Sequence, residues 1–276
     1  MQSVPKVLPD LSNRIATLDI LRGIALFGMI FLHFHQEFRL TTEGVAQYVG
    51  EELVGYIAWT GVEQKAWGTF AFLFGVGFAV LMCRAEQRGQ PMLLAYLRRL
   101  GALALIAVAM DALTGFTVLL EYALWGVPLL FMRKWPTALL LVIALLSAFA
   151  PQAVGRLMKT GLGIVNEQWL AFTYIGALTL LVAYRPQWTS RLVLFGVAGR
   201  MALTNYVTQC TVIFVLSSPF ALGLHLRPYF YALGAIALFG VAVVFSHLWL
   251  SRFRYGPLEW MWRTATYARV PPLLKA

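Results

Sequence analysis

The chain has 276 residues, of which 60% are hydrophobic and only 12% are charged, and its mean hydropathy is +0.72. Soluble proteins average about 45–50% apolar and about 25% charged residues, so this chain has too little polar material to cover a water-soluble globule. The composition excludes a soluble single-core protein and indicates a polytopic membrane protein. The formal net charge of +10 raises the question of nucleic acid, which the positions of the basic residues decide.

Apolar stretches that approach the length of a bilayer recur along the whole chain. A transmembrane helix needs about 20 predominantly apolar residues. We therefore predict an all-α membrane bundle, a single integral membrane domain over 1–276 in which about eight helices span the bilayer. The predicted spans are residues 20–38, 66–83, 100–114, 116–132, 136–155, 168–184, 201–222 and 229–250.

The first span, which follows an expected cytoplasmic segment over 1–18, contains ionisable side chains. Arg22 and His33 are eleven residues apart, which on an α-helix is about three turns and about 16 Å, so they share a face. Because ionisable groups in a bilayer usually face a cavity or a protein interior, Arg22 is a candidate for binding an anion and His33 for base or acyl-carrier chemistry. The alternative is a local Asp19–Arg22 ion pair and a His33 that only hydrogen-bonds a neighbouring helix.

Two glycines of this span, Gly23 and Gly28, predict close approach by neighbouring helices, because small residues let helix backbones come together in a membrane. The segment that follows, 40–65, is too polar to cross a bilayer but contains aromatic residues among its acids. We expect it to lie at the outer interface. A lid over an external opening is the alternative.

The third and fourth spans form one long apolar stretch that is broken only around residues 111–117, which predicts a tight hairpin. Asp111 and Glu121 flank this break and are the carboxylates that we expect inside the later spans. Asp111 is a candidate to assist His33 in catalysis. The two carboxylates together are candidates for proton coupling in a transporter.

A polar cluster, GRMALTNYVTQ, occupies residues 199–209. Asn205 and Gln209 are one helical turn apart and share a face. Polar side chains on membrane helices often join helices by hydrogen bonds. The alternative is that they line a substrate passage that has Arg200 at its cytoplasmic mouth.

The last segment, residues 251–276, combines arginines and tryptophans with Gly256 and Pro257, a pair that is typical of a helix start. Such a composition favours a short helix in the cytoplasmic headgroup layer. We interpret this interfacial tail as an anchor and assign no catalysis to it.

The basic residues are distributed unevenly between the two sides of this topology. With a cytoplasmic N-terminus, 17 Lys and Arg residues fall in inside segments and 5 in outside segments. Cytoplasmic loops of membrane proteins carry the excess of Lys and Arg, so we expect both termini in the cytoplasm and the protein in the cytoplasmic (inner) membrane. Topology thus explains the net charge, and we expect the lipid bilayer and no nucleic acid as a partner.

Several common catalytic signatures are absent from the chain. It has no CxxC, HExxH or GxSxG motif and no Gly-rich phosphate loop. Its two cysteines, Cys83 and Cys210, lie 127 positions apart in apolar stretches, which argues against a zinc site and a disulfide framework. We expect no metal and no tightly bound cofactor.

Five stretches of the sequence together resemble the YeiB-like family of bacterial multi-pass membrane proteins, whose C-terminal region is a domain of unknown function. They are LDILRGIALFGMIF at 18–31, FAFLFGVGF at 70–78, YALWG at 122–126, GRMALTNYVTQC at 199–210 and FRYGPLEWMWRTATY at 253–267. Members are usually longer, which implies that this chain lacks helices between the YALWG segment and 168–184.

The resemblance also implies a chemistry. The family is distantly similar to membrane acyltransferases, including O-antigen acetylases and the lysosomal heparan-glucosaminide acetyltransferase. The O-antigen acetylase branch carries an Arg, ten residues and a His in its first span, and Arg22 and His33 fit this pattern. This likeness is one of fold, so it supports an activity by analogy only.

The resulting hypothesis is transfer of an acyl group from cytoplasmic acyl-CoA, as co-substrate, to an envelope or lipid-linked acceptor. In it His33 is the base or acyl carrier, Arg22 and Arg200 orient the anionic donor, and Asn205 with Gln209 lines the passage. The alternatives are a transporter or permease for a small amphiphile and a non-catalytic membrane scaffold. The sequence does not indicate an oligomeric state.

Overall fold

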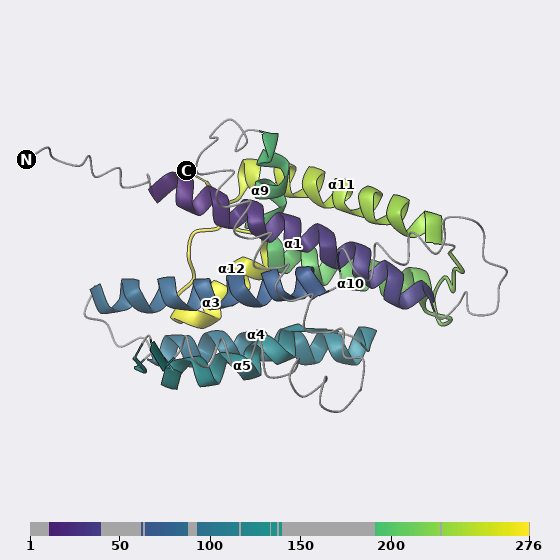
Figure 1. The fold of residues 1–276 in the computed structure, drawn as a ribbon. Helices are drawn as coiled ribbons and strands as arrows, with labels where there is room; N and C mark the ends of the chain where they lie inside the picture. The colour runs from purple at the N-terminus through teal and green to yellow at the C-terminus, as the bar shows by residue number, and fades with distance from the viewer. Residues whose placement is uncertain are drawn as a thin grey trace, which may run out of the picture.

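In the structure, a computed structural model, the regular secondary structure of the described residues is all helical, apart from one isolated bridge between Phe253 and Leu274. It describes residues 11–39, 62, 64–87, 93–115, 117–132, 134–136, 138–139, 191–226 and 228–275. The helices in these ranges, drawn in Figure 1, are α1 (Leu11–Arg39), α3 (Gln64–Gln87), α4 (Leu93–Thr114), α5 (Leu119–Met132), α9 (Val193–Arg200), α10 (Ala202–Ser217), α11 (Pro228–Arg252) and α12 (Pro257–Tyr267). The predicted all-α fold class is confirmed.

Six apolar helical segments coincide with predicted spans, and the protein is a membrane protein. Three are long enough to cross a bilayer, namely Ala16–Phe38, Leu93–Thr114 and Phe230–Arg252. Three are shorter, namely Gly68–Met82, Leu119–Met132 and Ala202–Ser217. The predicted spans at 136–155 and 168–184 and the predicted interfacial segment at 40–65 fall almost wholly outside the described residues. The total of eight spans and the cytoplasmic termini therefore stay predictions.

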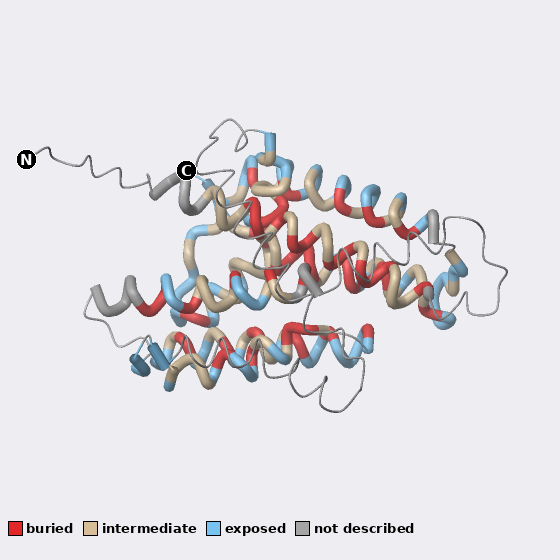
Figure 2. Tube along the Cα trace, viewed as in Figure 1, coloured by how far each residue is buried: buried red, intermediate tan, exposed pale blue. Residues whose placement is uncertain are grey.

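Helix α1 lies at the centre of the bundle and contacts α3, α9, α10 and α11. Its inward residues, among them Leu26, Met29 and Leu32, have no exposed surface. Figure 2 shows buried residues along α1, whereas α4 and α11 carry exposed residues on their outer faces. Large apolar side chains such as Leu105 and Val241 are exposed there. Outward apolar faces of this kind suit a lipid environment.

Glycines allow α1 to cross α9 with the two backbones in contact. A Cβ atom on Gly23 would lie 1.9 Å from the carbonyl oxygen of Phe195, and one on Gly199 would lie 1.9 Å from the carbonyl oxygen of Asp19. Gly28 faces α3 in the same way, at a wider separation. The close packing predicted from Gly23 and Gly28 is confirmed, and it brings the end of α9 against the turn of α1 that carries Arg22.

The hairpin predicted around residues 111–117 is also confirmed. Helix α4 ends one residue before Gly115, whose φ of +72° lies in the left-handed region that favours glycine. The Gly115 N–H donates to the carbonyl oxygen of Asp111 at 2.8 Å. The turn contacts α10, because the N–H of Val118 donates to the Tyr206 hydroxyl at 3.2 Å.

The helix start predicted at Gly256 and Pro257 is confirmed as the first turn of α12. This helix lies against α4 and the beginning of α10. Helix α10 itself begins after a single non-helical residue, Met201, that separates it from α9. The beginning of α10 thus lies where α1, α9, α4 and α12 converge.

Candidate functional site

A cavity of about 720 Å³ lies among these converging helices and α3 and α5. Its volume falls in the range typical of small-molecule sites. Its charged and aromatic lining residues are Arg22, Arg99, Arg200, Arg263, Glu259, Phe70, Phe74, Tyr122, Tyr206, Tyr255, Trp262 and Tyr267. The lining therefore combines cations with aromatic rings.

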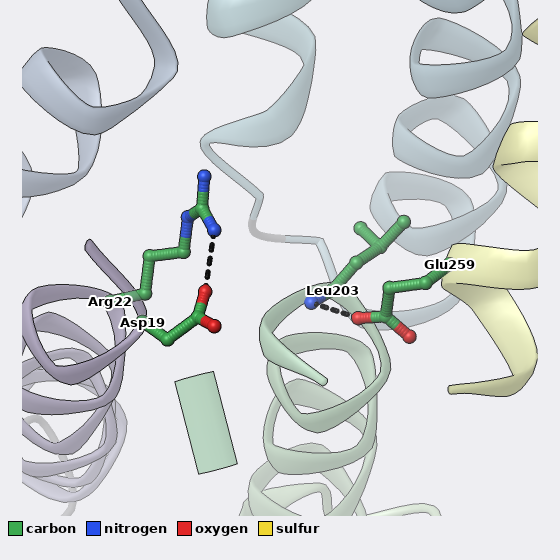
Figure 3. A network of polar contacts seen from close by, with 4 residues as sticks. All are labelled: Asp19, Arg22, Leu203 and Glu259. Atoms are coloured by element: carbon green, nitrogen blue, oxygen red, sulfur yellow. Dashed lines mark hydrogen bonds and ion pairs between the residues drawn. The ribbon is translucent and has the colours of Figure 1, made fainter. Parts of the chain in front are cut away.

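Four arginines, Arg22, Arg99, Arg200 and Arg263, make up what we call the arginine end of the cavity. The Arg22 Nη1 atom lies 2.8 Å from Asp19 Oδ1, as Figure 3 shows, so the predicted local ion pair forms. Within the described ranges this is the only ion pair at the cavity. Arg99, Arg200 and Arg263 consequently form no ion pair there, although Asp19 lies within electrostatic range of Arg200.

Aromatic rings hold two of these arginines in place. The Arg99 guanidinium lies 3.9 Å from the centre of a Trp262 ring, and the Trp262 indole N–H donates to the Arg99 carbonyl oxygen at 2.8 Å. The Arg263 guanidinium lies 4.5 Å from the centre of the Tyr255 ring. Cation–π contacts fix a guanidinium without neutralising it, so the arginine end keeps its positive charge.

Glu259 fastens α12 to the first turn of α10. Its Oε1 accepts the backbone N–H groups of Leu203 at 2.7 Å, drawn in Figure 3, and Thr204 at 3.0 Å, and its Oε2 accepts the Thr204 hydroxyl. These amides are the donors that a helix N-terminus leaves without intrahelical partners. Burial raises the pKa of Glu259 above its ordinary range, although hydrogen bonds from Thr204 oppose the shift.

Four aromatic side chains, Phe70, Phe74, Tyr122 and Tyr206, make up what we call the aromatic end of the cavity. Tyr122 stacks on Phe70 and Phe74, with ring centres 6.2 and 5.9 Å apart. Phe70 also contacts Tyr206, at 6.2 Å between ring centres. The cavity is thus cationic at one end and apolar at the other.

His33 lies outside the cavity lining and is only 3% exposed. Its Nδ1 is 3.5 Å from Gln209 Nε2 and 3.7 Å from Cys210 Sγ. Its ring meets the Tyr206 ring edge-on at 5.8 Å between centres. Tyr206 therefore touches both the cavity and His33, and only Arg22 of the predicted Arg22–His33 pair faces the cavity.

Asn205 joins three helices. Its Nδ2 donates to the Ala198 carbonyl oxygen of α9 at 3.0 Å and to the Ser246 hydroxyl of α11 at 2.8 Å. It makes the interhelical hydrogen bonds that we predicted as one of its two possible uses. Neither Asn205 nor Gln209 lines this cavity, so their role in a substrate passage stays a prediction.

The remaining predicted site residues, Arg200, Asp111 and Glu121, differ in whether they line the cavity. Arg200 lines the cavity together with Arg22, as the hypothesis requires. Asp111 and Glu121 are exposed and do not line it. Their roles in catalysis or proton coupling stay predictions.

Sequence reasoning missed the contribution of α12 and of Arg99. The Trp262–Arg99 contact joins residues 163 positions apart, which no local pattern reveals. One available signal was the single acid, Glu259, three residues after Gly256 in an otherwise basic segment. A carboxylate in such a segment often has a defined structural partner.

Two protein-family models match the chain. Residues 124–269 match "Protein of unknown function (DUF418)", and residues 14–184 match "Heparan-alpha-glucosaminide N-acetyltransferase, catalytic". No solved structure matches the chain.

Three bacterial relatives, all described as uncharacterized, resemble it. YxaH of Bacillus subtilis (strain 168) is 27% identical over 398 aligned positions, with 97% of this chain and 98% of the relative covered. The 39.9 kDa protein in the amylase 3' region of Bacillus acidopullulyticus is 27% identical over 341 positions, with 96% and 97% covered. YeiB of Escherichia coli (strain K12) is 32% identical over 105 positions, 37% of this chain and 27% of the relative. The alignment with YxaH is longer than this 276-residue chain, so YxaH has internal segments that the chain lacks.

Proposed function

The chain belongs to the DUF418 family of YeiB-like proteins and is a membrane acyltransferase-like protein, and from this premise we propose that its cavity binds a phosphate-bearing acyl thioester such as acyl-CoA. The proposed reaction transfers the acyl group to an envelope or lipid-linked acceptor. The match to the heparan-alpha-glucosaminide N-acetyltransferase model supports the reaction class. The geometry of the cavity supports the donor.

One observation carries the proposal, namely that three arginines of the arginine end, Arg99, Arg200 and Arg263, line one cavity and form no ion pair in the described part of the chain. Arg99 is partly buried and the other two are exposed, and cations gathered around one cavity repel one another and attract an anion. Guanidinium groups match phosphate oxygens in geometry and bind them with two hydrogen bonds. A phosphorylated donor supplies the missing anion, and its acyl arm fits the apolar remainder of the cavity.

We further propose that the arginine end faces the cytoplasm, where acyl-CoA is found. The distribution of 17 basic residues to one side and 5 to the other supports this orientation. The beginning of α1 and the segment after α12 lie at the same end of the bundle in Figure 1, as this topology requires.

In the proposed reaction an acceptor hydroxyl or amine attacks the acyl carbon. A bond forms between the acceptor atom and that carbon, the carbon–sulfur bond of the thioester breaks, and the thiolate leaves. His33 takes the proton of the acceptor and returns it to the thiolate, so that a thiol is released. Tyr206 contacts both His33 and the cavity, so in this reaction the acceptor reaches the acyl carbon past the edge of the Tyr206 ring, on the side where His33 lies.

Ligand binding tests the donor site. Purified protein in lipid nanodiscs is titrated with CoA and with acetyl-CoA while its thermal unfolding is followed. We expect both ligands to raise the Tm, and Arg99→Gln to weaken their affinity at least tenfold, since hydrogen bonds between charged groups are worth about 1.5–3 kcal/mol. Arg98→Gln is the matched control, because Arg98 is exposed on α4 and does not line the cavity.

Two results would overturn the donor site: no stabilisation by either ligand, or equal affinities in the Arg99→Gln and wild-type proteins. Nanodiscs that contain phosphatidic acid form a further arm, since a lipid phosphate has the same head chemistry. If stabilisation that depends on Arg99 comes from this lipid and not from CoA, the acyl-CoA assignment is wrong.

A separate assay tests His33. Membranes that contain wild-type or His33→Gln protein are supplied with acyl-labelled acetyl-CoA, and label in lipid and glycan fractions is measured. We expect His33→Gln to bind CoA as the wild type does and to lose label transfer by about 100-fold, within the range for general-base catalysis. Transfer at the wild-type rate would remove His33 from the reaction and leave the donor site intact.

A further inference from the structure

The aromatic end of the cavity bears on which acyl group the donor carries, an inference that rests on the proposed function. The cavity follows α3 from Phe70 to Leu81, about 16 Å of helix at 1.5 Å per residue. A Cβ atom on Gly77 would lie 4.0 Å from Arg99 Nη2, so Arg99 lies beside Gly77. Phe70 is seven residues away, which places the aromatic end about 10 Å from that guanidinium along α3.

Tyr206 is held at this end from three directions. Its ring contacts Phe70 of α3 on one side and His33 of α1 on another. Its hydroxyl accepts the N–H of Val118 in the turn between α4 and α5. The side chain is buried. A ring with this many fixed contacts forms a rigid wall at the aromatic end of the cavity.

We propose that Tyr206, with Phe70 and Tyr122 beside it, closes the cavity and limits the length of the acyl group that the donor carries. Short acyl thioesters fit in front of this wall, and long ones do not. Each additional methylene that finds apolar space tightens binding about fourfold, whereas one that meets a filled and rigid site is repelled. Affinity therefore changes sharply with chain length at the point where the acyl group reaches Tyr206.

The test compares CoA with acetyl-, butyryl- and octanoyl-CoA by thermal shift and calorimetry in nanodiscs. For the wild type we expect octanoyl-CoA to bind at least tenfold more weakly than acetyl-CoA. Tyr206→Ala removes the wall, so the affinity for octanoyl-CoA relative to that for acetyl-CoA should rise at least tenfold over the wild-type ratio. Tyr206→Phe keeps the ring and should keep the wild-type preference.

A second pair of variants covers the case in which Tyr206→Ala does not fold. Phe70→Ala shortens another side chain of the same wall and should admit octanoyl-CoA in the same way. Phe72→Ala is its matched control, because Phe72 is on the same helix but is 37% exposed and does not line the cavity. It should bind the whole series as the wild type does.

The outcomes separate this inference from the proposed function. If CoA binds in an Arg99-dependent way, but octanoyl-CoA binds the wild type as tightly as acetyl-CoA does, the limit on chain length is wrong and the donor site stands. The same conclusion follows if neither Tyr206→Ala nor Phe70→Ala changes the preference. If neither CoA nor any acyl-CoA binds, the proposed function falls and this inference falls with it.

Discussion

The arginines at the arginine end of the cavity and the polar side chains inside α10 differ in whether the protein itself supplies their partners. At the arginine end, Arg99, Arg200 and Arg263 line one cavity and form no ion pair in the described part of the chain. Inside α10, the Asn205 amide is bound to two neighbouring helices. Cations gathered around one cavity suit an anionic ligand, whereas satisfied hydrogen bonds point to packing.

Gln209 lies between these two cases. It is 1% exposed, its Oε1 has no hydrogen-bond partner among the described residues, and its Nε2 is 3.5 Å from His33 Nδ1. A buried amide oxygen without a partner is destabilising by about 1–3 kcal/mol. Gln209 therefore stabilises the contacts between helices less than Asn205 does, although both side chains lie on one face of α10.

The largest expected effect comes from disrupting the packing of α9 against α1, on which both regions depend. The end of α9 supplies Arg200 to the cavity and the Ala198 carbonyl oxygen to Asn205. It is held against α1 at Gly23, where a Cβ atom would lie 1.9 Å from a backbone oxygen. Gly23→Ala should cost more than about 3 kcal/mol, because two backbones have to separate. Size-exclusion chromatography in detergent should then show little folded, monodisperse protein.

The control for this substitution is Gly101→Ala on α4, where no atom of the described ranges lies within 4 Å of the added Cβ atom. It should behave as the wild type does. A Gly23→Ala protein with wild-type yield and Tm would mean that α1 and α9 do not cross as described.

Local sequence signals predicted much of the helix arrangement. The length of the apolar stretches located six helical segments, and Gly115 marked the hairpin. Gly23 marked the crossing, and the Gly256–Pro257 pair marked the start of α12. Each of these features depends on a residue and its near neighbours, because helix length, left-handed backbone and close approach are properties of single elements.

The lining of the cavity could not be predicted in this way. The spacing of Arg22 and His33 correctly places them on the same helix, but the neighbouring helices decide which of them faces a cavity. Tyr206 packs against His33, and α12 brings Trp262 to Arg99 from 163 positions away. The sequence showed α12 as an interfacial helix, since its basic and aromatic residues suit lipid headgroups as well as they suit a cavity wall.

A comparison of Asn205 with Gln209 sharpens the contrast within α10. Asn205→Ala removes the buried hydrogen bonds that join α10 to the Ala198 carbonyl oxygen of α9 and the Ser246 hydroxyl of α11, so it should lower the free energy of unfolding by about 2 kcal/mol. Gln209→Met replaces an amide that has one unpartnered atom with an apolar group of similar size, so the change should stay within about 1 kcal/mol. Denaturant or thermal unfolding in detergent measures both.

Neither substitution should change the affinity for CoA, because neither side chain lines the cavity. Thr208→Ala is the control for α10 itself, since Thr208 is exposed and its hydroxyl donates to the Thr204 carbonyl oxygen of the same helix. A larger loss of stability for Gln209→Met than for Asn205→Ala would reverse the assignment of packing roles in this helix.

The smallest expected effect concerns pH and the carboxylate that borders the arginine end. Burial raises the pKa of Glu259 above its ordinary value of 4.5, so the folded protein holds this proton more tightly than the unfolded chain does. The stability that this difference contributes is fully present below pH 4.5 and is lost as the pH rises through the folded-state pKa. Glu259→Gln does not titrate and keeps an acceptor for the amides of Leu203 and Thr204.

The variant should therefore gain stability relative to the wild type as the pH rises from about 4 to about 8. The difference in Tm between Glu259→Gln and wild-type protein, measured in the same detergent across that range, checks the sign. Glu121→Gln, at an exposed carboxylate of α5, should give a flat difference. A Glu259→Gln protein that loses stability relative to the wild type with rising pH would show that the ionised carboxylate is favoured at the start of α10. In that case hydrogen bonds and the helix dipole outweigh burial there.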